Sequence, residues 1–280
     1  MSAINELKEG LAQTETAQFV TTMLRDISAT KLQSIRARFE ANLTYFKELH
    51  ELMSLVQEYA DERATGEKAK IVPHQKVYVA VTSNKRFYGT LNHEIIHALH
   101  DALLDDVTSD CVVVGQTGRQ IVDVAPLPSN PRFIAFLKDE PTEAELLSCI
   151  MSLSSYHEIV VIHPTFVNSF QQHAFSTDLT HVASTQKSDA RRTIDYMFEP
   201  DIPKIITFFQ TQIRLVLFSR VMLETQLALT GARLMKMQRA RERAGELVIQ
   251  QSRTIHKEMS TMKGMRLLET FAGFHGTKTP

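Results

Sequence analysis

The distribution of proline divides this chain of 280 residues into three parts. Eight of its nine prolines lie between Pro73 and Pro203, and the ninth is the last residue. A proline inside a helix removes one backbone hydrogen bond and clashes with the preceding turn, so a long helix excludes it. We therefore expect two terminal helical segments, 1–65 and 204–275, on either side of a differently built segment, 73–203.

Apolar residues recur every three or four positions in both terminal segments, which is the spacing of one helix face. In the first segment they are Phe39, Leu43, Phe46, Leu49, Met53, Val56 and Ala60, and in the last Met237, Ala240, Ala244, Leu247, Ile255, Met259 and Met262. A helix of about 55 residues is about 80 Å long and cannot bury such a stripe by itself. Each terminal helix therefore needs a partner.

The two ends also differ in charge, although the whole chain has a formal net charge of only −1. Residues 1–62 contain six basic and ten acidic side chains, whereas residues 233–266 contain nine basic and three acidic ones. Opposite charges favour two helices that lie side by side. We predict that the terminal helices pair with each other; two unrelated helical hairpins are the alternative.

The middle segment has the pattern of alternating strands and helices. Three short runs rich in β-branched residues, Lys76–Thr82, Cys111–Gly115 and Glu158–His163, are typical of buried strands. Helical patterns lie between them at Leu91–Leu104 and Thr142–Leu153. This alternation predicts a small α/β layer with parallel strands, inserted between the terminal helices.

Composition argues against several classes of protein. The near-zero net charge disfavours bulk binding of nucleic acid, and the basic run Lys236–Arg243 has no interleaved aromatic side chain for base stacking. Two cysteines, Cys111 and Cys149, make no disulfide framework and indicate a reducing compartment. The most apolar stretch, Ile205–Phe218, is interrupted by five polar residues, so we expect no membrane span. From the charge and the missing aromatic residues we expect no nucleic-acid partner.

One short pattern is that of zinc proteases. His93–His97 reads H-E-x-x-H, with His100 one turn further on, and a helix would place the two imidazoles on one face with Glu94 as general base. So short a pattern arises by chance about as often as in true zinc enzymes, and no further ligand stands out in the sequence. A zinc hydrolase is therefore kept only as an alternative.

Other patterns for catalysis or cofactor binding are weaker still. The glycine pair in Gly115–Gln120 lacks the spacing of a triphosphate-binding loop, and no G-x-G-x-x-G follows a strand. Cys149 lies in the apolar run LLSCIMSL, where a thiol belongs to the core. We expect no cofactor, no metal site and no catalytic residue in this chain.

Five motifs, spread in order over nearly the whole chain, resemble those of the gamma subunit of F-type ATP synthases. Ile27–Leu32 (ISATKL) is similar to the family's V-A-A-S-K-L, and Ser83–Asn92 (SNKRFYGTLN) to its S-x-x-x-G-L-C-G-x-L-N. Phe166–Asn168 matches F-x-N, Tyr196–Asp201 (YMFEPD) matches Y-x-[YF]-E-P-D, and Ala232–Met237 (ARLMKM) resembles A-R-M-x-A-M-K. One such match would be weak, whereas the ordered set is specific.

The resemblance implies a fold and a function. The implied fold is α/β with a long coiled coil: the N- and C-terminal helices form an antiparallel coiled coil, and a central Rossmann-like α/β domain is inserted between them. The implied function is that of the central-stalk rotor, which couples ion flow through the c ring to conformational change and ATP synthesis or hydrolysis in the alpha/beta catalytic hexamer. The chain itself would be non-catalytic and peripheral, on the cytoplasmic side of the cell inner membrane.

The resemblance also implies contact residues, carried over position by position. They are Lys31, Arg233 and Glu269 for the catalytic alpha and beta subunits, and Tyr196, Phe198 and Glu199 for the epsilon subunit and the c-subunit ring. For each residue the alternative is a plain structural role, such as a core position for Phe198.

Several positions depart from the family pattern. The lysine-rich K-I-T-K-A-M appears here as FVTTML at residues 19–24, and Arg86–Gly89 replaces the turn G-L-C-G with one glycine fewer. Near the C-terminus Ser260, Gly264 and Arg266 replace a Gln, a Thr and a Glu. Since the chain begins almost directly on the helix, without room for a transit peptide, we expect a divergent gamma subunit of bacterial type. A coiled-coil scaffold of unrelated function is the structural alternative.

Overall fold

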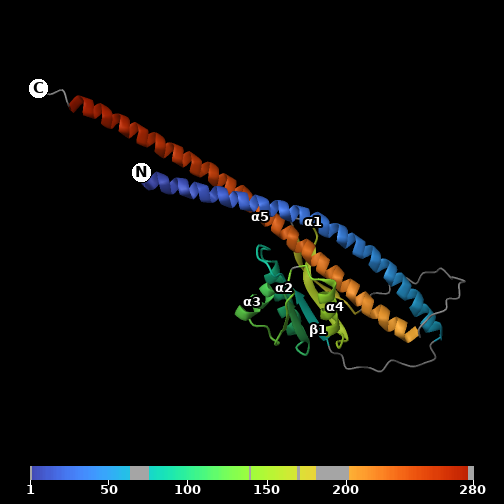
Figure 1. The fold of residues 1–280 in the computed structure, drawn as a ribbon. Coiled ribbons are helices and arrows are strands. Elements are labelled where there is room, and N and C mark those ends of the chain that lie inside the picture. Colours follow the sequence, from blue (N-terminus) through green and yellow to red (C-terminus); the bar gives the residue numbers. More distant parts are fainter. Residues whose placement is uncertain (1, 64–75, 139, 169–170, 181–201, 277–280) are drawn as a thin grey trace. The chain divides into compact units, whose positions relative to one another are not determined.

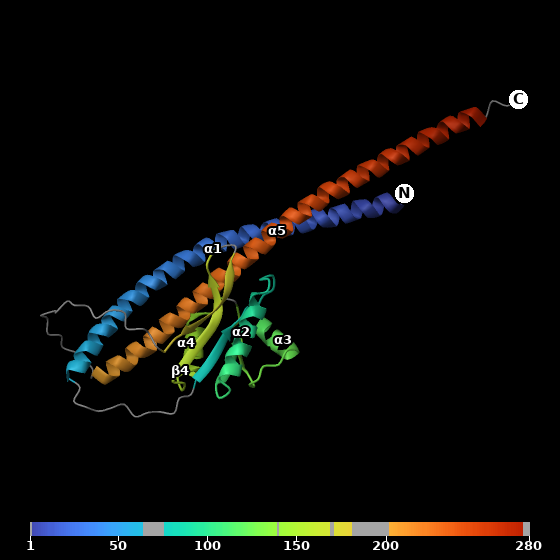
Figure 2. The same ribbon diagram turned by 180° about the vertical axis from the view of Figure 1, so that it is seen from behind.

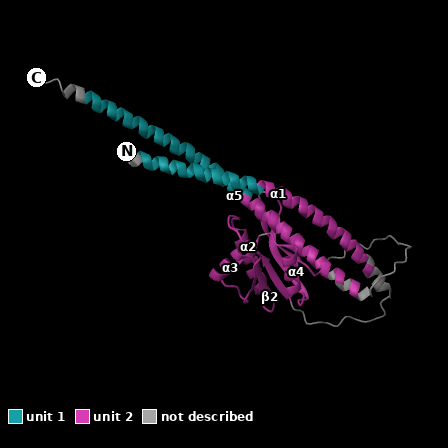
Figure 3. Ribbon diagram, viewed as in Figure 1, with its two compact units in different colours: residues 1–28, 234–280 teal, residues 29–233 magenta. Residues whose placement is uncertain are grey.

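A computed structural model describes residues 2–63, 76–138, 140–168, 171–180 and 202–276 of the chain (Figure 1). The chain divides into two compact units, unit 1 with residues 1–28 and 234–280, and unit 2 with residues 29–233 (Figure 3). The N-terminal helix α1 (Ser2–Arg63) and the C-terminal helix α5 (Ile202–Gly276) contribute residues to both units. The two long helices predicted from the absence of proline are therefore confirmed.

In unit 1 the first part of α1 lies along the last part of α5 (Figures 1 and 2). Ile4 of α1 lines the same hollow of about 190 Å³ as Met259 of α5. Further along α1, Gln18 is so close to Gly245 of α5 that an added Cβ would lie 3.0 Å from its Nε2. Rising residue numbers in α1 thus meet falling numbers in α5, which confirms the antiparallel pairing.

Unit 2 is built around a five-stranded sheet with the order β3-β2-β1-β4-β5. Its strands are β1 (Lys76–Val81), β2 (Asp110–Val114), β3 (Arg132–Ile134), β4 (Glu158–Phe166) and β5 (Gln172–Asp178), and its shorter helices are α2 (Leu91–Asp105), α3 (Gln116–Val124) and α4 (Glu143–Ser152). Strands β3, β2, β1 and β4 are parallel, whereas β5 runs antiparallel to β4.

Alternate side chains of the central strand β1 face two different layers of helix. Ala80 belongs to a buried cluster with Leu99 of α2, whereas Val79 belongs to a cluster with Phe218 of α5 and residues of α4. This alternation follows from the two-residue period of a strand. Helices cover both faces, as parallel strands require, and the inserted α/β fold is confirmed.

Three elements of unit 2 were not predicted from the sequence. They are α3, β3 and β5. Strand β3 has only three residues, and β5 (QHAFSTD) is polar because it lies at an edge of the sheet and is half exposed. We also expected the third strand to stop at His163, before Pro164, but β4 continues to Phe166. Because β1 pairs with β4 only as far as Ile162, no residue of β1 is paired opposite Pro164.

Helix α5 is apolar enough to resemble a membrane span, which we did not expect. Among the described residues, one window of 18 within Thr211–Ala272 has a mean hydropathy of 1.2. However, 78% of that window is buried inside the protein. A helix that is apolar on all sides and covered by other elements is a core helix, and α5 has this character in unit 2.

Replacement of Gly231 by alanine should destabilise unit 2, although alanine is the better helix former. An added Cβ would lie 2.8 Å from Cε2 of Phe166, whose ring packs beside a buried cluster of α1 and α5 residues. We expect the free energy of unfolding in urea to fall by about 1–3 kcal/mol, because overpacking outweighs the gain in helix propensity.

Gly264 provides the matched control for this substitution. Apart from the neighbouring residues of its own helix, no atom lies within 4 Å of the Cβ that Gly264→Ala would add, so this change should raise stability by about 0.5–1 kcal/mol. Equal effects of the two alanines would show that the contact with Phe166 does not constrain position 231.

Candidate functional site

The motif Ser83–Asn92 forms a loop after β1 whose two ends are tied together. The backbone N–H of Ser83 donates to Oδ1 of Asn92 at 3.1 Å, and Nδ2 of Asn92 donates to Oγ of Ser83 at 2.9 Å. Both side chains are buried, so these bonds satisfy groups that water does not reach. The loop between them, residues 83–90, is held at a defined position beside the sheet.

The glycine pair at the start of α3 serves the same loop. The backbone N–H groups of Gln116, Thr117 and Gly118 donate to Oδ1 of Asn84, the carbonyl of Ser83 and Oγ1 of Thr82, each at 3.0 Å. A phosphate would need these helix N-terminal donors. Gly115, with a φ of 102°, lets the two backbones meet, because an added Cβ would lie 2.5 Å from the carbonyl oxygen of Thr82. The turn therefore packs α3 against the end of β1, and its N–H donors are paired with acceptors of the chain itself.

The 83–90 loop contains an uncommon backbone conformation. Phe87 has a φ of 76° and Gly89 a φ of 70°. A positive φ at a bulky residue costs about 1–3 kcal/mol and persists only where neighbours hold it. Phe87 is 65% exposed, whereas the next residue, Tyr88, is buried. The loop thus presents one aromatic ring to solvent and uses the other as an anchor.

Arg233 of α5 holds the loop against the helix. Its Nη2 donates to the carbonyl oxygen of Arg86 at 3.1 Å, and its guanidinium carbon lies 4.4 Å from the centroid of the Tyr88 ring. Tyr88 also packs with Leu229 of α5 in a small buried cluster. A hydrogen bond to a charged donor and a cation–π contact are each worth about 1 kcal/mol or more. These contacts can balance the strain at Phe87.

Lys31 of α1 is engaged with an acidic residue that we did not predict. Its ammonium forms an ion pair with Glu140, which also lies 3.7 Å from Nη1 of Arg38. The hydrogen bond from Lys31, followed by the charges of Lys31, Arg38 and Lys85, lowers the pKa of Glu140. The carboxylate thus joins the segment after β3 to α1 and faces Lys85 of the 83–90 loop.

The other predicted contact residues belong to unit 1 or lie outside the described residues. Glu269 is exposed on the part of α5 that belongs to unit 1. Tyr196, Phe198 and Glu199 lie outside the described residues. Lys31, Arg233 and the 83–90 loop all belong to unit 2. Their roles toward partner subunits stay predictions, while their contacts within the chain are those given above.

The zinc-protease pattern lies on the exposed face of α2. His93, Glu94 and His97 are exposed; Oε1 of Glu94 accepts a hydrogen bond from Oγ1 of Thr90 at 2.7 Å, and Nδ1 of His97 lies 2.9 Å from Asp101. In the part of the chain that the structure describes, no three His, Cys, Asp or Glu side chains are grouped as ligands for a metal ion. The pattern therefore gains no support as a metal centre.

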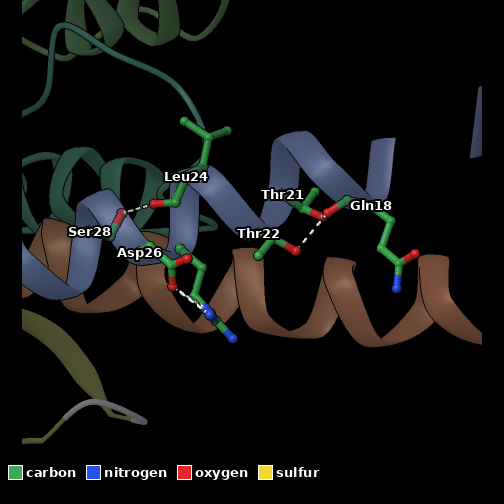
Figure 4. Close-up of polar contacts among 7 residues, drawn as sticks. Gln18, Thr21, Thr22, Leu24, Asp26 and Ser28 are labelled. Atoms are coloured by element: carbon green, nitrogen blue, oxygen red, sulfur yellow. Dashed lines mark hydrogen bonds and ion pairs between the residues drawn. The ribbon is translucent and has the colours of Figure 1, made fainter. Parts of the chain in front are cut away.

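The segment 19–24 of α1, where Phe19 and Thr22 stand in place of the family's two lysines, has an uncharged surface. Oγ1 of Thr21 and of Thr22 donate to the carbonyl oxygen of Gln18 at 2.9 and 2.8 Å, which turns both hydroxyls back onto the helix (Figure 4). The exposed apolar side chains in and beside this segment are Phe19, Val20, Met23 and Ile27, with exposed fractions between 48% and 64%. This face of α1 can offer apolar contacts but few ionic ones.

Comparisons with known proteins point to one family. The profile of the family described as ATP synthase matches residues 3–259. The ATP synthase gamma chain of Flavobacterium psychrophilum is 23% identical over 286 residues, which cover 99% of this chain and 100% of that protein. The gamma chain of Symbiobacterium thermophilum is 24% identical over 244 residues, which cover 84% of each.

Solved structures show a similar fold. The rotor of the Euglena gracilis mitochondrial ATP synthase in rotational state 1 matches with a TM-score of 0.63 at 12% identity, over 93% of this chain and 99% of that one. The central stalk and c ring of the Tetrahymena thermophila mitochondrial ATP synthase includes a chain that matches with a TM-score of 0.57 at 15% identity, over 79% of this chain and 99% of that one.

The chain belongs to the ATP synthase family, because the family profile covers nearly all of it. Since the curated relatives are gamma chains, it is a divergent F-type gamma subunit of bacterial type, a central-stalk component of a membrane-associated complex. The resemblance drawn from the five motifs is thereby confirmed.

Replacement of Arg233 by alanine should release the 83–90 loop. We expect the free energy of unfolding in urea to fall by about 1–3 kcal/mol, because a charge-assisted hydrogen bond and the stacking on Tyr88 are lost together. Amide hydrogen exchange in residues 83–90 should become faster. Arg239→Ala, at an exposed position of the same helix, is the control and should change neither quantity. An unchanged loop in Arg233→Ala would contradict the proposed anchoring.

The pairs of Glu140 with Lys31 and Arg38 should give a small, salt-dependent stabilisation. Because the pKa of Glu140 is lower in the folded chain, its contribution is complete above the unfolded pKa of about 4.5 and is lost as the pH falls through the folded value. Glu140→Gln should therefore cost less than about 1 kcal/mol near neutral pH at low salt, and nothing in acid or in about 1 M salt. A cost that persists at high salt would indicate packing rather than charge.

Proposed function

We propose that this gamma subunit is the rotor that couples ion flow through the c ring to conformational change in the alpha/beta catalytic hexamer. The observation that supports this most is the antiparallel pair of α1 and α5 in unit 1 of a chain from this family. A paired shaft favours one conformation of a catalytic site only insofar as it touches the alternatives differently. The chemistry then belongs to the beta subunits, and this chain supplies contacts.

Unit 1 has the surface that such contacts require. Large apolar side chains are exposed on α5 near its C-terminal end, including Leu267 at 58%, Leu268 at 71% and Phe271 at 64%, and on α1 at residues 19–27. Exposed apolar residues concentrated on a paired helix favour burial against another protein. We infer that the catalytic hexamer supplies that cover, with apolar rather than acidic surfaces opposite residues 19–27.

The predicted contact residues keep their roles in this proposal, with one refinement. Glu269 is exposed on α5, so it can reach the hexamer directly. Lys31 and Arg233 are occupied by Glu140 and by the 83–90 loop. We infer that Lys31 and Arg233 act indirectly, by fixing the surface that meets the alpha and beta subunits. Phe87 is an exposed side chain of that surface.

The foot of the rotor and its location complete the proposal. We propose that Tyr196, Phe198 and Glu199 contact the epsilon subunit and the c-subunit ring, on the basis of their match to the family motif. Segments 1–65 and 204–275 would form the shaft, and segment 73–203 would be the α/β domain beside it. The complex would place the chain peripherally on the cytoplasmic side of the inner membrane.

Assembly with the other subunits tests the proposal. Co-expression with the cognate alpha, beta, epsilon and c subunits, followed by purification in mild detergent, should recover all of them with this chain, identified by mass. The complex should hydrolyse ATP. Recovery of the chain without any of these subunits would favour an unrelated coiled-coil scaffold.

A substitution in the exposed apolar surface makes the test specific. Leu268→Asp with Phe271→Asp should weaken assembly with the alpha and beta subunits at least about tenfold, because two apolar contacts worth about 1.5–3 kcal/mol each are lost. Leu104→Asp, at a side chain that is 56% exposed on α2, is the matched control and should assemble normally. Equal assembly of the two variants would place the hexamer contact elsewhere.

A further inference from the structure

A histidine is completely buried where the hairpin of β4 and β5 packs against α5. His163 on β4 has an exposed fraction of 0%. Its Nε2 lies 2.9 Å from Oγ1 of Thr177 on β5, and its Nδ1 lies 3.3 Å from the carbonyl oxygen of Pro164. The ring of Phe175 meets the imidazole edge-on, with centroids 6.3 Å apart. The proposed function as a rotor subunit does not explain why an imidazole is buried at this position.

A cavity of about 490 Å³ lies beside these contacts. Thr177 and Phe175, the neighbours of His163 on β5, form part of its wall, together with Leu217 and Val221 of α5. A cavity of this size with polar groups in its wall admits water. The packing of the hairpin on α5 therefore contributes to the separation of the imidazole from water in this cavity.

The charged groups around His163 oppose one another. On α5 the carboxylate of Glu224 favours an imidazolium, and the guanidinium of Arg220 disfavours it. Glu224 also accepts a hydrogen bond from Thr165 on β4. On β5 the titratable neighbour is His173, which pairs with Thr165 and lines the same cavity. The carboxylate of Glu224 is therefore shared between Thr165 and His163.

We propose that His163 makes the packing of the β4–β5 hairpin on α5 sensitive to protons. The hairpin stays closed while the imidazole is neutral, and it opens when the imidazole takes up a proton, since the charged ring must reach water. Opening moves the hairpin away from Leu217 and Val221 and lets water from the cavity reach the ring. Acidification thus loosens the attachment of the sheet to the C-terminal helix, whether or not the chain is assembled with partners.

The balance of forces around the ring sets the direction of this response. Burial is the largest effect and lowers the pKa of His163; Glu224 and the carbonyl of Pro164 oppose it, and Arg220 adds to it. Above the unfolded pKa of about 6.5 the closed state keeps its full stability. As the pH falls below that value toward the folded pKa, opening takes up one proton, so the opening equilibrium should rise by up to about tenfold per pH unit.

Hydrogen exchange in the purified full chain tests this inference. Protection of the amides of β5, corrected for the intrinsic pH dependence of exchange, should fall by up to about tenfold between about pH 7.5 and 5.5. His163→Gln, which keeps polar groups but does not titrate, should lose this pH dependence. His97→Gln, on the exposed face of α2, is the control and should keep it.

Two further variants retain His163 and should shift the response in opposite directions. Arg220→Gln removes a cation that opposes protonation and should make the acid response smaller. Glu224→Gln removes the anion that favours protonation and should make the response larger and extend it to lower pH. A merely structural role of these side chains would not reverse the sign. Identical pH profiles in wild type and His163→Gln, or shifts of the same sign in the two α5 variants, would overturn the proposal.

Discussion

Unit 2 depends on the burial of one stretch of α5, from Ile213 to Ala232. On one side Phe218 and its neighbours pack against the sheet and α4, and on the other Leu223 and Leu227 pack against Ile35 of α1. Each large apolar side chain that is fully buried contributes about 1.5–3 kcal/mol. A helix covered on several sides has little freedom to shift, so it fixes where the sheet, the 83–90 loop and α1 lie within this unit.

The candidate site uses that fixed helix as its support. Arg233 follows directly after the buried stretch, and its guanidinium holds the loop through the carbonyl of Arg86 and the ring of Tyr88. On the other side of the loop, the first N–H groups of α3 donate hydrogen bonds to the side chains of Asn84 and of Thr82, which follows β1. In nucleotide-binding proteins with an α/β sheet, N–H groups at such a helix N-terminus bind a phosphate. Here the same N–H groups donate to acceptors of the chain itself. The candidate site therefore presents an exposed protein surface and not a ligand-binding pocket. Such a surface suits a subunit that acts through contacts with other subunits.

The sequence predicted the elements whose pattern is strong and missed those whose pattern is weak. The strand at Lys76 and the helix at Leu91 are apolar and regular, and both are present. Strand β5 escaped prediction because an edge strand needs few apolar residues. Glu140 gave no signal in the sequence, since its partner Lys31 is far away along the chain and ion pairs have no local spacing. Of the predicted contact residues, the structure explains what Lys31 and Arg233 touch within the chain.

The sequence by itself determined the two long helices, because the absence of proline and the regular apolar stripes depend only on neighbours along the chain. It also determined the family, through motifs spread over nearly the whole chain. Only the tertiary structure decided that the Gly115 turn packs against Thr82, that Arg233 holds the loop on which Phe87 is exposed, and that His163 is buried between the β4–β5 hairpin and α5. Such properties arise from contacts between distant residues, and burial, charge and strain acquire their values only when those residues meet.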